Sequence, residues 1–506
     1  MIKKLFKLLF SRIFIIILLV LLQFAVIFVP LYVLNRSTFF NIFFWVIGIL
    51  VVLYVIKQDI EPSFKLVWTI VILLLPVLGA GLYFIFGDKQ HVNKNIRKSH
   101  DYRTKSHHLL IGEIKHNNIS INHSPLSKDV MAYLQNQGFP GHNNTNIAFF
   151  PWGMDKFNSL LIDLKNAKEF IFLEYFIIDD GYMWDTILDI LKQKVKEGVE
   201  VRLIYDGFGC LTTLPHNYDK KINSYGIKCR IFNEIKPMIT FKVNNRDHRK
   251  ILIIDGKYGY TGGINLADEY INKINRFGVW KDTAIRLEGD AVYSLTFLFL
   301  QMWNSIKDDN EDYQKYHIPS KIKKNNLVIP FGDDPTDKER VGENVYIKIF
   351  NQAKKYVYLT TPYLICDDTI NSAITLAAKS NVEIFIITPG IYDKKMVSWL
   401  TKSSYHRLLK AGVRIFEYSK GFVHAKQYVS DDKIAMVGTI NMDYRSFYHH
   451  YECSTYIEDE QLALSVKEDI LNLIKECKEI KLDEIKEPGI IKRLFTDILR
   501  IFAPLM

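Results

Sequence analysis

Several residue patterns are scarce or absent in this sequence of 506 residues. Its five cysteines stand far apart and form no C-x-x-C pair, so the sequence supports neither a disulfide framework nor a zinc knuckle. Only 15 prolines and 26 glycines accompany 48% apolar and 24% charged residues, which excludes a disordered, collagenous or low-complexity chain. No G-x-x-x-x-G-K-S/T loop for nucleotide phosphates occurs. We therefore expect a folded protein with room for more than one domain.

Excess positive charge is missing from most of the chain. The formal net charge is +10 at pH 7, of which residues 1–90 carry +5, residues 91–125 carry +4 and residues 126–506 only +1. A nucleic-acid-binding domain normally concentrates basic residues, so we expect no nucleic-acid partner for the globular part. The basic segment 91–125 instead follows the hydrophobic part of the chain, where Lys and Arg favour an anionic lipid surface.

Long uncharged stretches are confined to the first 90 residues. Residues 13–34, 39–56 and 66–86 contain no charged side chain, and each is close to the roughly 20 residues that a helix needs to cross a bilayer. The first stretch is longer than the apolar core of a signal peptide, and no cleavage site follows it. We predict an integral, multi-pass protein of the cell membrane with two or three transmembrane helices. Basic residues lie on both sides in nearly equal number, so the membrane face of the globular part stays open.

From about residue 126, short apolar β-type runs alternate with helical stretches, which indicates an α/β architecture. The order of these runs repeats, so we predict two homologous domains. The matching runs are 167–176 with 353–363, 198–207 with 381–390, and 226–233 with 412–419. The predicted division is a membrane anchor at 1–90, a basic juxtamembrane segment at 91–125, a first domain at 126–306, an acidic and proline-containing linker at 307–342, a second domain at 343–486 and an amphipathic C-terminal helix at 487–506. That helix either lies at a membrane interface or packs on the second domain.

One pattern of histidine, lysine and aspartate occurs once in each half. Each copy has the spacing H-x-K-x-x-x-x-D, and G-G/T-I-N follows after six intervening residues. A single copy arises by chance in many chains, whereas two copies at matching places of a repeat are a specific signal. The motif residues are His248, Lys250, Asp255 and Asn265 in the first copy and His424, Lys426, Asp431 and Asn441 in the second.

These side chains suit chemistry on a phosphodiester. Residues two apart on a strand share a face, so each histidine is expected beside the lysine of its motif. Lysine and asparagine side chains can hold the nonbridging oxygens and stabilise transition-state charge. One neutral imidazole can attack phosphorus while the other, protonated, gives its proton to the leaving oxygen, and the ordinary histidine pKa near 6.5 permits both roles. The set requires neither a metal nor a cofactor.

The paired motifs resemble the signature of the phospholipase D superfamily, and further segments resemble its bacterial cardiolipin synthase branch. These are LLLPVLGAGLYFIFG (73–87), NNRDHRKILIIDG around His248, GGINLADEY (262–270), WKDT (280–283), TPYLICDD (361–368) and NMDYRSF (441–447). The resemblance implies two phospholipase D-like domains, each a mixed β-sheet flanked by helices, with the active site at their interface. It also implies a reaction that converts two phosphatidylglycerol molecules into cardiolipin and glycerol through a covalent phosphatidyl-histidine, so the expected partners are phosphatidylglycerol and membrane lipids.

The resemblance further implies a role for each motif residue. His248 would be the nucleophile and His424 the general acid and later the general base, although the residues themselves leave this assignment open. Asp282 and Glu452 resemble the acids that orient the histidines, and Thr439 could add a phosphate contact. Lys250, Lys426, Asn265 and Asn441 would bind the phosphate. Asp255 and Asp431 would complete the catalytic motif, in either a catalytic or a structural role.

Other functions stay open at this point. The same scaffold serves a phospholipase D that uses water or another phosphatidyltransferase, and a nuclease or a catalytically silent membrane scaffold is a more distant alternative. The sequence also leaves open the acceptor, the acyl-chain preference, the oligomeric state and whether residues 13–34 span the membrane.

Overall fold

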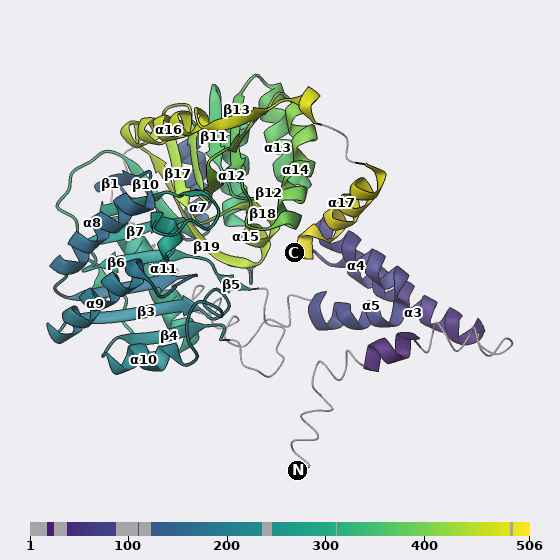
Figure 1. Cartoon of the computed structure of the whole chain (residues 1–506), viewed down its shortest axis with the longest axis horizontal. Helices are drawn as coiled ribbons and strands as arrows, with labels where there is room; N and C mark the ends of the chain where they lie inside the picture. Colours follow the sequence, from purple (N-terminus) through teal and green to yellow (C-terminus); the bar gives the residue numbers. More distant parts are fainter. Residues whose placement is uncertain are drawn as a thin grey trace, which may run out of the picture. The chain divides into compact units, whose positions relative to one another are not determined.

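The computed structural model describes residues 18–24, 38–87, 110, 123–234, 245–309, 311–337, 339–485 and 489–505. The chain forms two compact units (Figure 1). One unit comprises Met1–Lys94, Ile235–Val243 and Ile490–Met506, and the other comprises Asn95–Glu234 and Asn244–Gly489.

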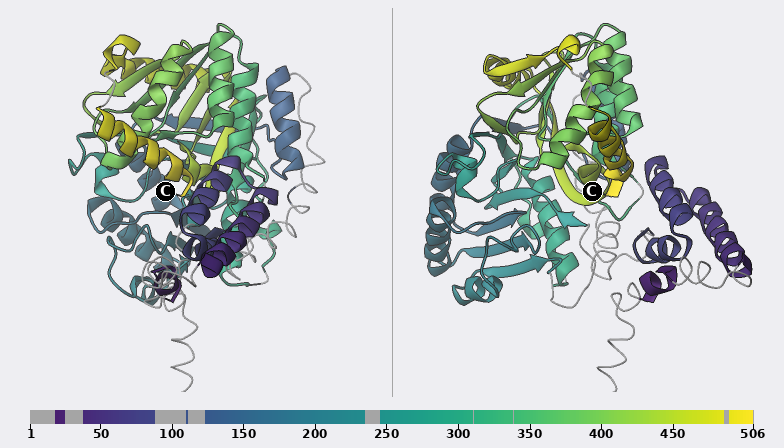
Figure 2. Two further views of the ribbon diagram at one scale, coloured as in Figure 1. Left: turned by 90° about the vertical axis from the view of Figure 1, so that its right-hand side faces the viewer. Right: turned by 45° about the vertical axis from the view of Figure 1, so that its right-hand side comes forward.

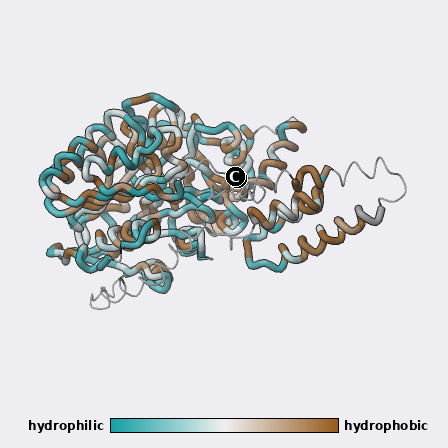
Figure 3. Tube along the Cα trace, turned by 90° about the horizontal axis from the view of Figure 1, so that it is seen from below, coloured by the Kyte–Doolittle hydropathy of each residue, from teal (hydrophilic) through white to brown (hydrophobic). Residues whose placement is uncertain are grey.

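The first unit is helical. Its elements are α3 (Thr38–Lys57), α4 (Pro62–Leu74), α5 (Pro76–Leu82), the π-helix η1 (Tyr83–Gly87), α17 (Ile490–Phe502) and the 3-10 turn η6 (Ala503–Leu505). Figure 3 shows hydrophobic residues along most of the N-terminal helices. Val55, Trp68, Ile72 and Tyr83 belong to a small core in which the rings of Trp68 and Tyr83 meet edge to face at 5.4 Å. The predicted C-terminal helix is α17, which packs on α4 of the same unit.

The apolar stretch 66–86 is not one continuous helix. It breaks at Leu75, whose φ of −135° and ψ of 76° are not helical, and α5 begins at Pro76. Proline lacks an N–H donor and disfavours the helical conformation of the residue before it, which accounts for the break.

The predicted transmembrane helices are not confirmed. Among the residues that the structure describes, no helix combines the length and the apolar character needed to cross a membrane. Most of the stretch 13–34 and nearly all of the basic segment 91–125 lie outside the described residues.

The second unit contains two α/β halves whose sheets share one order of seven strands, to which the second sheet adds β20 at its end. The first sheet runs β1-β9-β7-β6-β2-β3-β4, and the second runs β10-β19-β17-β16-β11-β13-β14-β20. Three neighbouring strands of each sheet are parallel, β2-β3-β4 in the first and β11-β13-β14 in the second. The other neighbours along these two orders are antiparallel. The predicted pair of mixed sheets flanked by helices is therefore confirmed.

The elements of the first half are β1 (Thr145–Phe150), α8 (Gly153–Asn166), β2 (Phe170–Tyr175), α9 (Tyr182–Lys196), β3 (Glu200–Asp206), α10 (Tyr218–Ser224), β4 (Lys228–Phe232), β5 (Arg246–Asp247), β6 (Lys250–Ile254), β7 (Tyr258–Gly262), η3 (Asp268–Ile271), β8 (Val279–Lys281), β9 (Ala284–Gly289) and α11 (Val292–Ile306). The 3-10 turn η4 (Gln314–Tyr316) follows α11, and its Tyr316 contacts Arg202 and Phe172 of the first half. The elements of the second half are β10 (Leu327–Asp333), α12 (Val341–Gln352), β11 (Tyr356–Thr360), β12 (Leu364–Ile365), α13 (Asp368–Lys379), β13 (Glu383–Pro389), α14 (Lys395–Lys410), β14 (Arg414–Tyr418), β15 (Gly421–Val423), β16 (Gln427–Ser430), β17 (Ile434–Gly438), β18 (Met442–Asp443), α15 (Tyr444–Tyr448), β19 (His450–Glu458), α16 (Glu460–Ile474), β20 (Cys477–Ile480) and η5 (Leu482–Glu484).

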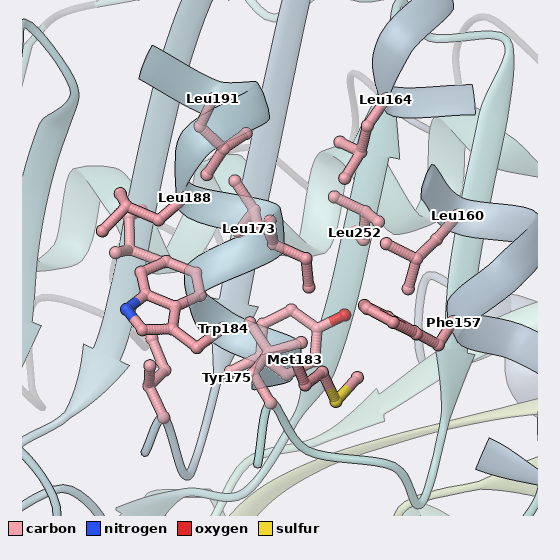
Figure 4. Close-up of a cluster of buried hydrophobic side chains, with 14 of the residues drawn as sticks. Phe157, Leu160, Leu164, Leu173, Tyr175, Met183, Trp184, Leu188, Leu191 and Leu252 are labelled. Carbon is pink, nitrogen blue, oxygen red and sulfur yellow. The ribbon is translucent and has the colours of Figure 1, made fainter. Parts of the chain in front are cut away.

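The core of the first half lies between its sheet and the helices α8 and α9 (Figure 4). Apolar residues recur every three or four positions along both helices, which places them on one face toward the sheet. The indole N–H of Trp184 is satisfied inside this core because it donates to the Tyr218 hydroxyl at 2.6 Å. The labelled core residues are Phe157, Leu160 and Leu164 of α8, Met183, Trp184, Leu188 and Leu191 of α9, and Leu173, Tyr175 and Leu252 of the sheet.

The structure differs from the predicted division of the chain at two places. The segment 307–342 is not only a linker, because it contains the buried strand β10, in which Pro330 is paired in register with Thr455 of β19. Proline is tolerated there because β10 is an edge strand. The helix α7 (Pro125–Asn136), predicted within the first domain, packs instead on α12 and β10 of the second half. Lys348 of α12 pairs with Asp129 of α7 at 2.8 Å, and Figure 2 shows α7 beside the second half.

The last long helix of each half contacts both sheets. α11 packs on β2, β4, β6, β7 and β9 of its own half and touches β10, and α16 packs on β11, β14, β16, β17 and β20 and touches β1. The two halves of the second unit are therefore held together by equivalent helices, which brings their equivalent strands face to face.

Candidate active site

Two short parallel strand pairs join the halves beside the predicted motifs. β5, just before His248, pairs with β19 of the second half, and β15, just before His424, pairs with β8 of the first half. The backbone N–H of His248 donates to the carbonyl of Tyr451 at 2.9 Å, and that of His424 donates to the carbonyl of Lys281 at 2.7 Å. His248 lies between β5 and β6, and His424 lies between β15 and β16. The backbone of each is bonded to the opposite half, so the two histidines are related by a pseudo-two-fold axis.

Each histidine is also paired with a carboxylate of the opposite half. Nδ1 of His248 lies 2.9 Å from both carboxylate oxygens of Glu452, and Nδ1 of His424 lies 2.6 Å from Oδ2 of Asp282. Both carboxylates are fully buried and each histidine is 7% exposed. A carboxylate at Nδ1 orients the ring so that Nε2 is the atom that can attack or transfer a proton. Neither half alone contains a complete pair.

Burial sets the protonation of these groups. Burial, reinforced by Lys250 and Lys426, lowers the pKa of His248, and burial together with Lys426 lowers the pKa of His424 to about 4 against the opposing effect of Asp282. Burial therefore favours the neutral form of both imidazoles in the free site, whereas the predicted chemistry requires one of them to carry a proton during the reaction. A bound phosphodiester anion would raise the pKa of these histidines, because negative charge favours the protonated form of a neighbouring imidazole.

The two motif lysines lie beside their histidines as predicted. Nζ of Lys250 donates to the carbonyl oxygen of His248 at 2.7 Å, and Nζ of Lys426 donates to the carbonyl oxygen of His424. Both lysines are almost fully buried, and burial lowers the pKa of Lys250 to about 8 and that of Lys426 to about 7. An ammonium that uses one N–H on the backbone keeps two others for an anionic ligand.

The two motif asparagines differ in their hydrogen bonds. The Asn265 side chain accepts from the N–H of Ile177 at 3.0 Å and donates to the Tyr270 hydroxyl at 2.7 Å, so its orientation is determined. The Nδ2 of Asn441 lies 3.5 Å from Asp443, and its buried Oδ1 has no hydrogen-bond partner among the described residues. Both asparagines are at most 4% exposed.

Asp255 and Asp431 are not placed beside the histidines. Asp255 follows the far end of β6 and accepts backbone N–H groups of residues 168–170 at 2.8, 2.8 and 2.9 Å. Asp431 does the same with residues 354–356 at 2.8, 2.8 and 3.0 Å. Both have a positive φ, 52° and 53°, which aspartate tolerates better than most residues. Each clamps the turn after its motif strand to the start of the neighbouring strand, so the structure points to a structural role.

The halves differ at the second residue of the downstream G-G/T-I-N motif. The hydroxyl of Thr439 donates to Glu452 and accepts from the N–H of Cys453 at 2.9 Å, so the predicted phosphate contact of this hydroxyl gives way to a contact with the carboxylate. A Cβ atom at the equivalent Gly263 would lie 2.0 Å from Oδ1 of Asp282. The first copy therefore requires glycine where the second accommodates threonine.

Two aromatic residues beside the histidines were not predicted as part of the site. His450 stands two positions before Glu452 on β19, and its ring centroid lies 5.4 Å from that of His248. Trp280 stands two positions before Asp282 in the same way, and its ring lies 5.4 Å from that of His424. The sequence could have indicated both residues, because each stands two positions before a predicted histidine-orienting acid, and residues two apart along a strand share a face.

The comparisons with known proteins agree with this geometry. Residues 160–303 and 346–474 match the family described as cardiolipin synthase, PLD-like domain, and residues 39–87 match the phospholipase D-nuclease N-terminal family. A cardiolipin synthase of Clostridium perfringens is 34% identical over 88% of this chain and 95% of its own length. Cardiolipin synthase 1 of Staphylococcus aureus is 32% identical over 90% of this chain and 94% of its own.

A solved structure shows the same fold. The crystal structure of a phosphatidylserine synthase of Haemophilus influenzae has a TM-score of 0.58 and 17% identity, and the match covers 75% of this chain and 98% of that one. Two repeated mixed sheets with two histidine motifs are the architecture of the phospholipase D superfamily. The chain belongs to the bacterial cardiolipin synthase family of that superfamily, and it is therefore an enzyme of the phosphatidyltransferase class.

Proposed function

We propose that the protein is a cardiolipin synthase that transfers a phosphatidyl group from one phosphatidylglycerol to another, giving cardiolipin and glycerol. The observation that carries the proposal is the crossed pair of buried histidine–carboxylate contacts, His248 with Glu452 and His424 with Asp282. Such a pair supplies one nucleophile and one acid–base group to a single phosphorus atom. The relatives named cardiolipin synthase support the choice of substrate.

In the proposed first step, Nε2 of His248 attacks phosphorus and the phosphorus–oxygen bond to glycerol breaks. Glu452 stabilises the positive charge that the imidazole acquires, since it lies 2.9 Å from Nδ1. His424 gives a proton to the departing glycerol oxygen. Because the pKa of free His424 is about 4, His424 acquires that proton only when the phosphodiester anion is bound beside it.

In the proposed second step, a hydroxyl of another phosphatidylglycerol gives its proton to His424 and attacks the phosphatidyl-histidine. The phosphorus–nitrogen bond breaks and His248 returns to its neutral form, so the two steps together consume no external energy donor. The phosphate oxygens are held throughout by the motif cations and amides, which are Lys250, Lys426, Asn265 and Asn441.

We also propose that residues 1–90 attach the enzyme to the cell membrane, where its lipid substrates are. Large apolar side chains on α3 support this, because Ile42, Leu50 and Leu53 are each more than half exposed, and exposed apolar clusters of this kind suit a lipid environment. The test is whether the full-length protein stays in the membrane pellet after washing with high salt and carbonate.

The deciding experiment for the reaction is to incubate membranes containing the protein with labelled phosphatidylglycerol and to separate the lipid products. We expect cardiolipin and glycerol in equal amounts, and no cardiolipin from a His248→Ala variant. Phosphatidic acid without cardiolipin would show a hydrolase of the same superfamily instead.

A further inference from the structure

Three side chains at the first histidine form a cluster that the proposed reaction does not require as a whole. They are His248, His450 and Glu452, and one ligand atom from each lies within 4.8 Å of the others. Nδ1 of His248 is 2.9 Å from Glu452, and Nδ1 of His450 is 3.6 Å from the same carboxylate. The three side chains are 7%, 8% and 0% exposed.

His450 is not used by the proposed reaction. Its Nδ1 is buried and makes no hydrogen bond to any residue that the structure describes, although a buried polar atom normally has a partner. Its nearest charged neighbour is Glu452, whose two oxygens are already held by His248, Thr439 and Ser446. The separation of 3.6 Å from Glu452 leaves Nδ1 of His450 without a close partner among the described residues, so this nitrogen is available to a ligand.

Two imidazoles and one carboxylate around one point are a ligand set for zinc-type ions. Zn²⁺ takes histidine nitrogen and carboxylate oxygen at about 2.0–2.2 Å, so neighbouring ligand atoms in such a site stand roughly 3–3.5 Å apart. The two separations between a histidine and the carboxylate, 2.9 and 3.6 Å, lie close to that range, and all three ligand atoms lie within 4.8 Å of one another. Mg²⁺ and Ca²⁺ prefer all-oxygen sites and are not expected here.

The pseudo-symmetric position of the other half offers two ligands among the described residues. His424 and Asp282 correspond to His248 and Glu452, but Trp280 stands where the second half has His450. The indole of tryptophan carries only a donor N–H and no lone pair for a metal. In the part of the chain that the structure describes, only the cluster around His248 therefore has a third metal ligand, and the equivalent cluster around His424 has two.

We propose that His248, His450 and Glu452 bind one transition-metal ion of the Zn²⁺ type, and that this ion inhibits the enzyme. The metal takes Nδ1 of His248 in place of its proton, so its positive charge withdraws electron density from the attacking Nε2 and occupies the carboxylate that stabilises the imidazolium. The inhibition rests on the proposed role of His248, whereas the binding does not.

The binding is tested by titrating Zn²⁺ against a chromophoric chelator, using tag-free full-length protein in detergent. The wild type is compared with His450→Asn and with His406→Asn, a control that removes an exposed histidine from α14. We expect His406→Asn to match the wild type and His450→Asn to lose affinity at one site by at least about 10-fold, since even outer partners of a metal ligand are worth 10–100-fold. Equal binding by all three proteins overturns the proposal.

A second measurement requires no variant. X-ray absorption at the zinc edge of the wild type loaded with one equivalent should show only nitrogen and oxygen neighbours near 2.0–2.2 Å. A sulfur neighbour near 2.3 Å would assign the ion to a cysteine instead and overturn the site.

The inhibition is tested in the lipid assay at buffered free Zn²⁺, with each protein scored against its own zinc-free rate. We expect His450→Asn to need at least about 10-fold more Zn²⁺ for half-inhibition than the wild type. If that variant loses the site but is inhibited as before, the inhibition is overturned and the binding stands. If the wild type makes no cardiolipin even without zinc, the proposed function fails while the titration still decides the metal site.

Discussion

The crossed pairing of histidines and carboxylates makes a quantitative prediction for Glu452→Gln. The amide keeps the shape of the side chain but removes the negative charge 2.9 Å from Nδ1 of His248. At that separation, and with an effective dielectric constant of about 20, the charge interaction with an imidazolium is roughly 4–6 kcal/mol. If this interaction is made in the transition state, its loss lowers kcat by about 10³–10⁴-fold, similar to the roughly 10⁴-fold loss when the aspartate of a Ser–His–Asp triad becomes asparagine.

The assay is cardiolipin formation from phosphatidylglycerol by purified protein in mixed micelles, with kcat and KM determined separately. A loss in kcat with little change in KM is expected, because in the proposed reaction Glu452 acts through its contact with His248. Glu452→Asp should restore part of the rate, since it returns the charge at a longer distance. Asp163→Asn is the matched control, because this buried carboxylate bonds Tyr260 and Arg286 away from the motifs.

Two results would refute the reasoning. One is a kcat for folded Glu452→Gln within about 10-fold of the wild type, since losing a charge interaction of roughly 4–6 kcal/mol requires a fall of at least about 10³-fold. The other is an equal loss of kcat in Asp163→Asn, which would show that any buried carboxylate has this effect through the stability of the fold.

Three further predictions concern single side chains. Asp255→Asn leaves one acceptor oxygen for three backbone N–H groups, so we expect a loss of about 1–2 kcal/mol and a lower Tm, with a rate per folded molecule close to the wild type; a large fall in that rate would return Asp255 to the chemistry. Burial lowers the pKa of His142 to about 3, so below about pH 6.5 the unfolded chain binds a proton that the folded protein does not. The free energy of unfolding therefore decreases as the pH is lowered, by up to about 1.4 kcal/mol per pH unit. Urea unfolding between pH 7.5 and 4.5 should show a smaller decrease in His142→Asn, and the same decrease as in the wild type would count against this role of His142. Gly263→Ala places a Cβ 2.0 Å from Asp282, which should displace this carboxylate from His424 and lower the activity about 100-fold or more. Gly489→Ala is the control, because its added Cβ meets no atom within 4 Å, and its activity should equal that of the wild type.

Much of the fold was readable from local patterns. The apolar runs predicted at 167–176, 198–207 and 226–233 contain β2, β3 and β4, and their repeats contain β11, β13 and β14. Of these, β2, β3, β11 and β13 are buried along nearly their whole length, and the apolar character of such strands does not depend on distant residues. The edge strand β10 was missed because it contains a proline. Pro330 is acceptable there because the outer side of β10 carries only an isolated bridge between Val328 and His142 among the described residues, and no further strand of the sheet.

The histidines, lysines and asparagines of the site were found because their spacing repeats, and the two acids were found by resemblance. Their partners were not predictable from spacing, because Glu452 is 204 residues from His248 and Asp282 is 142 residues from His424. Asp255 and Asp431 belong to the same motifs, yet their place at the far ends of β6 and β16 makes them backbone clamps.

The sequence by itself determined that this protein has two equivalent halves, each with one imidazole, one ammonium and one carboxamide at matching places, because those features depend on local spacing and repetition. Only the tertiary structure decided that the halves exchange their carboxylates. The pairings of β5 with β19 and of β15 with β8 carry each acid to the histidine of the other half. A contact of that kind is set by how two sheets pack together, which no local pattern of residues encodes.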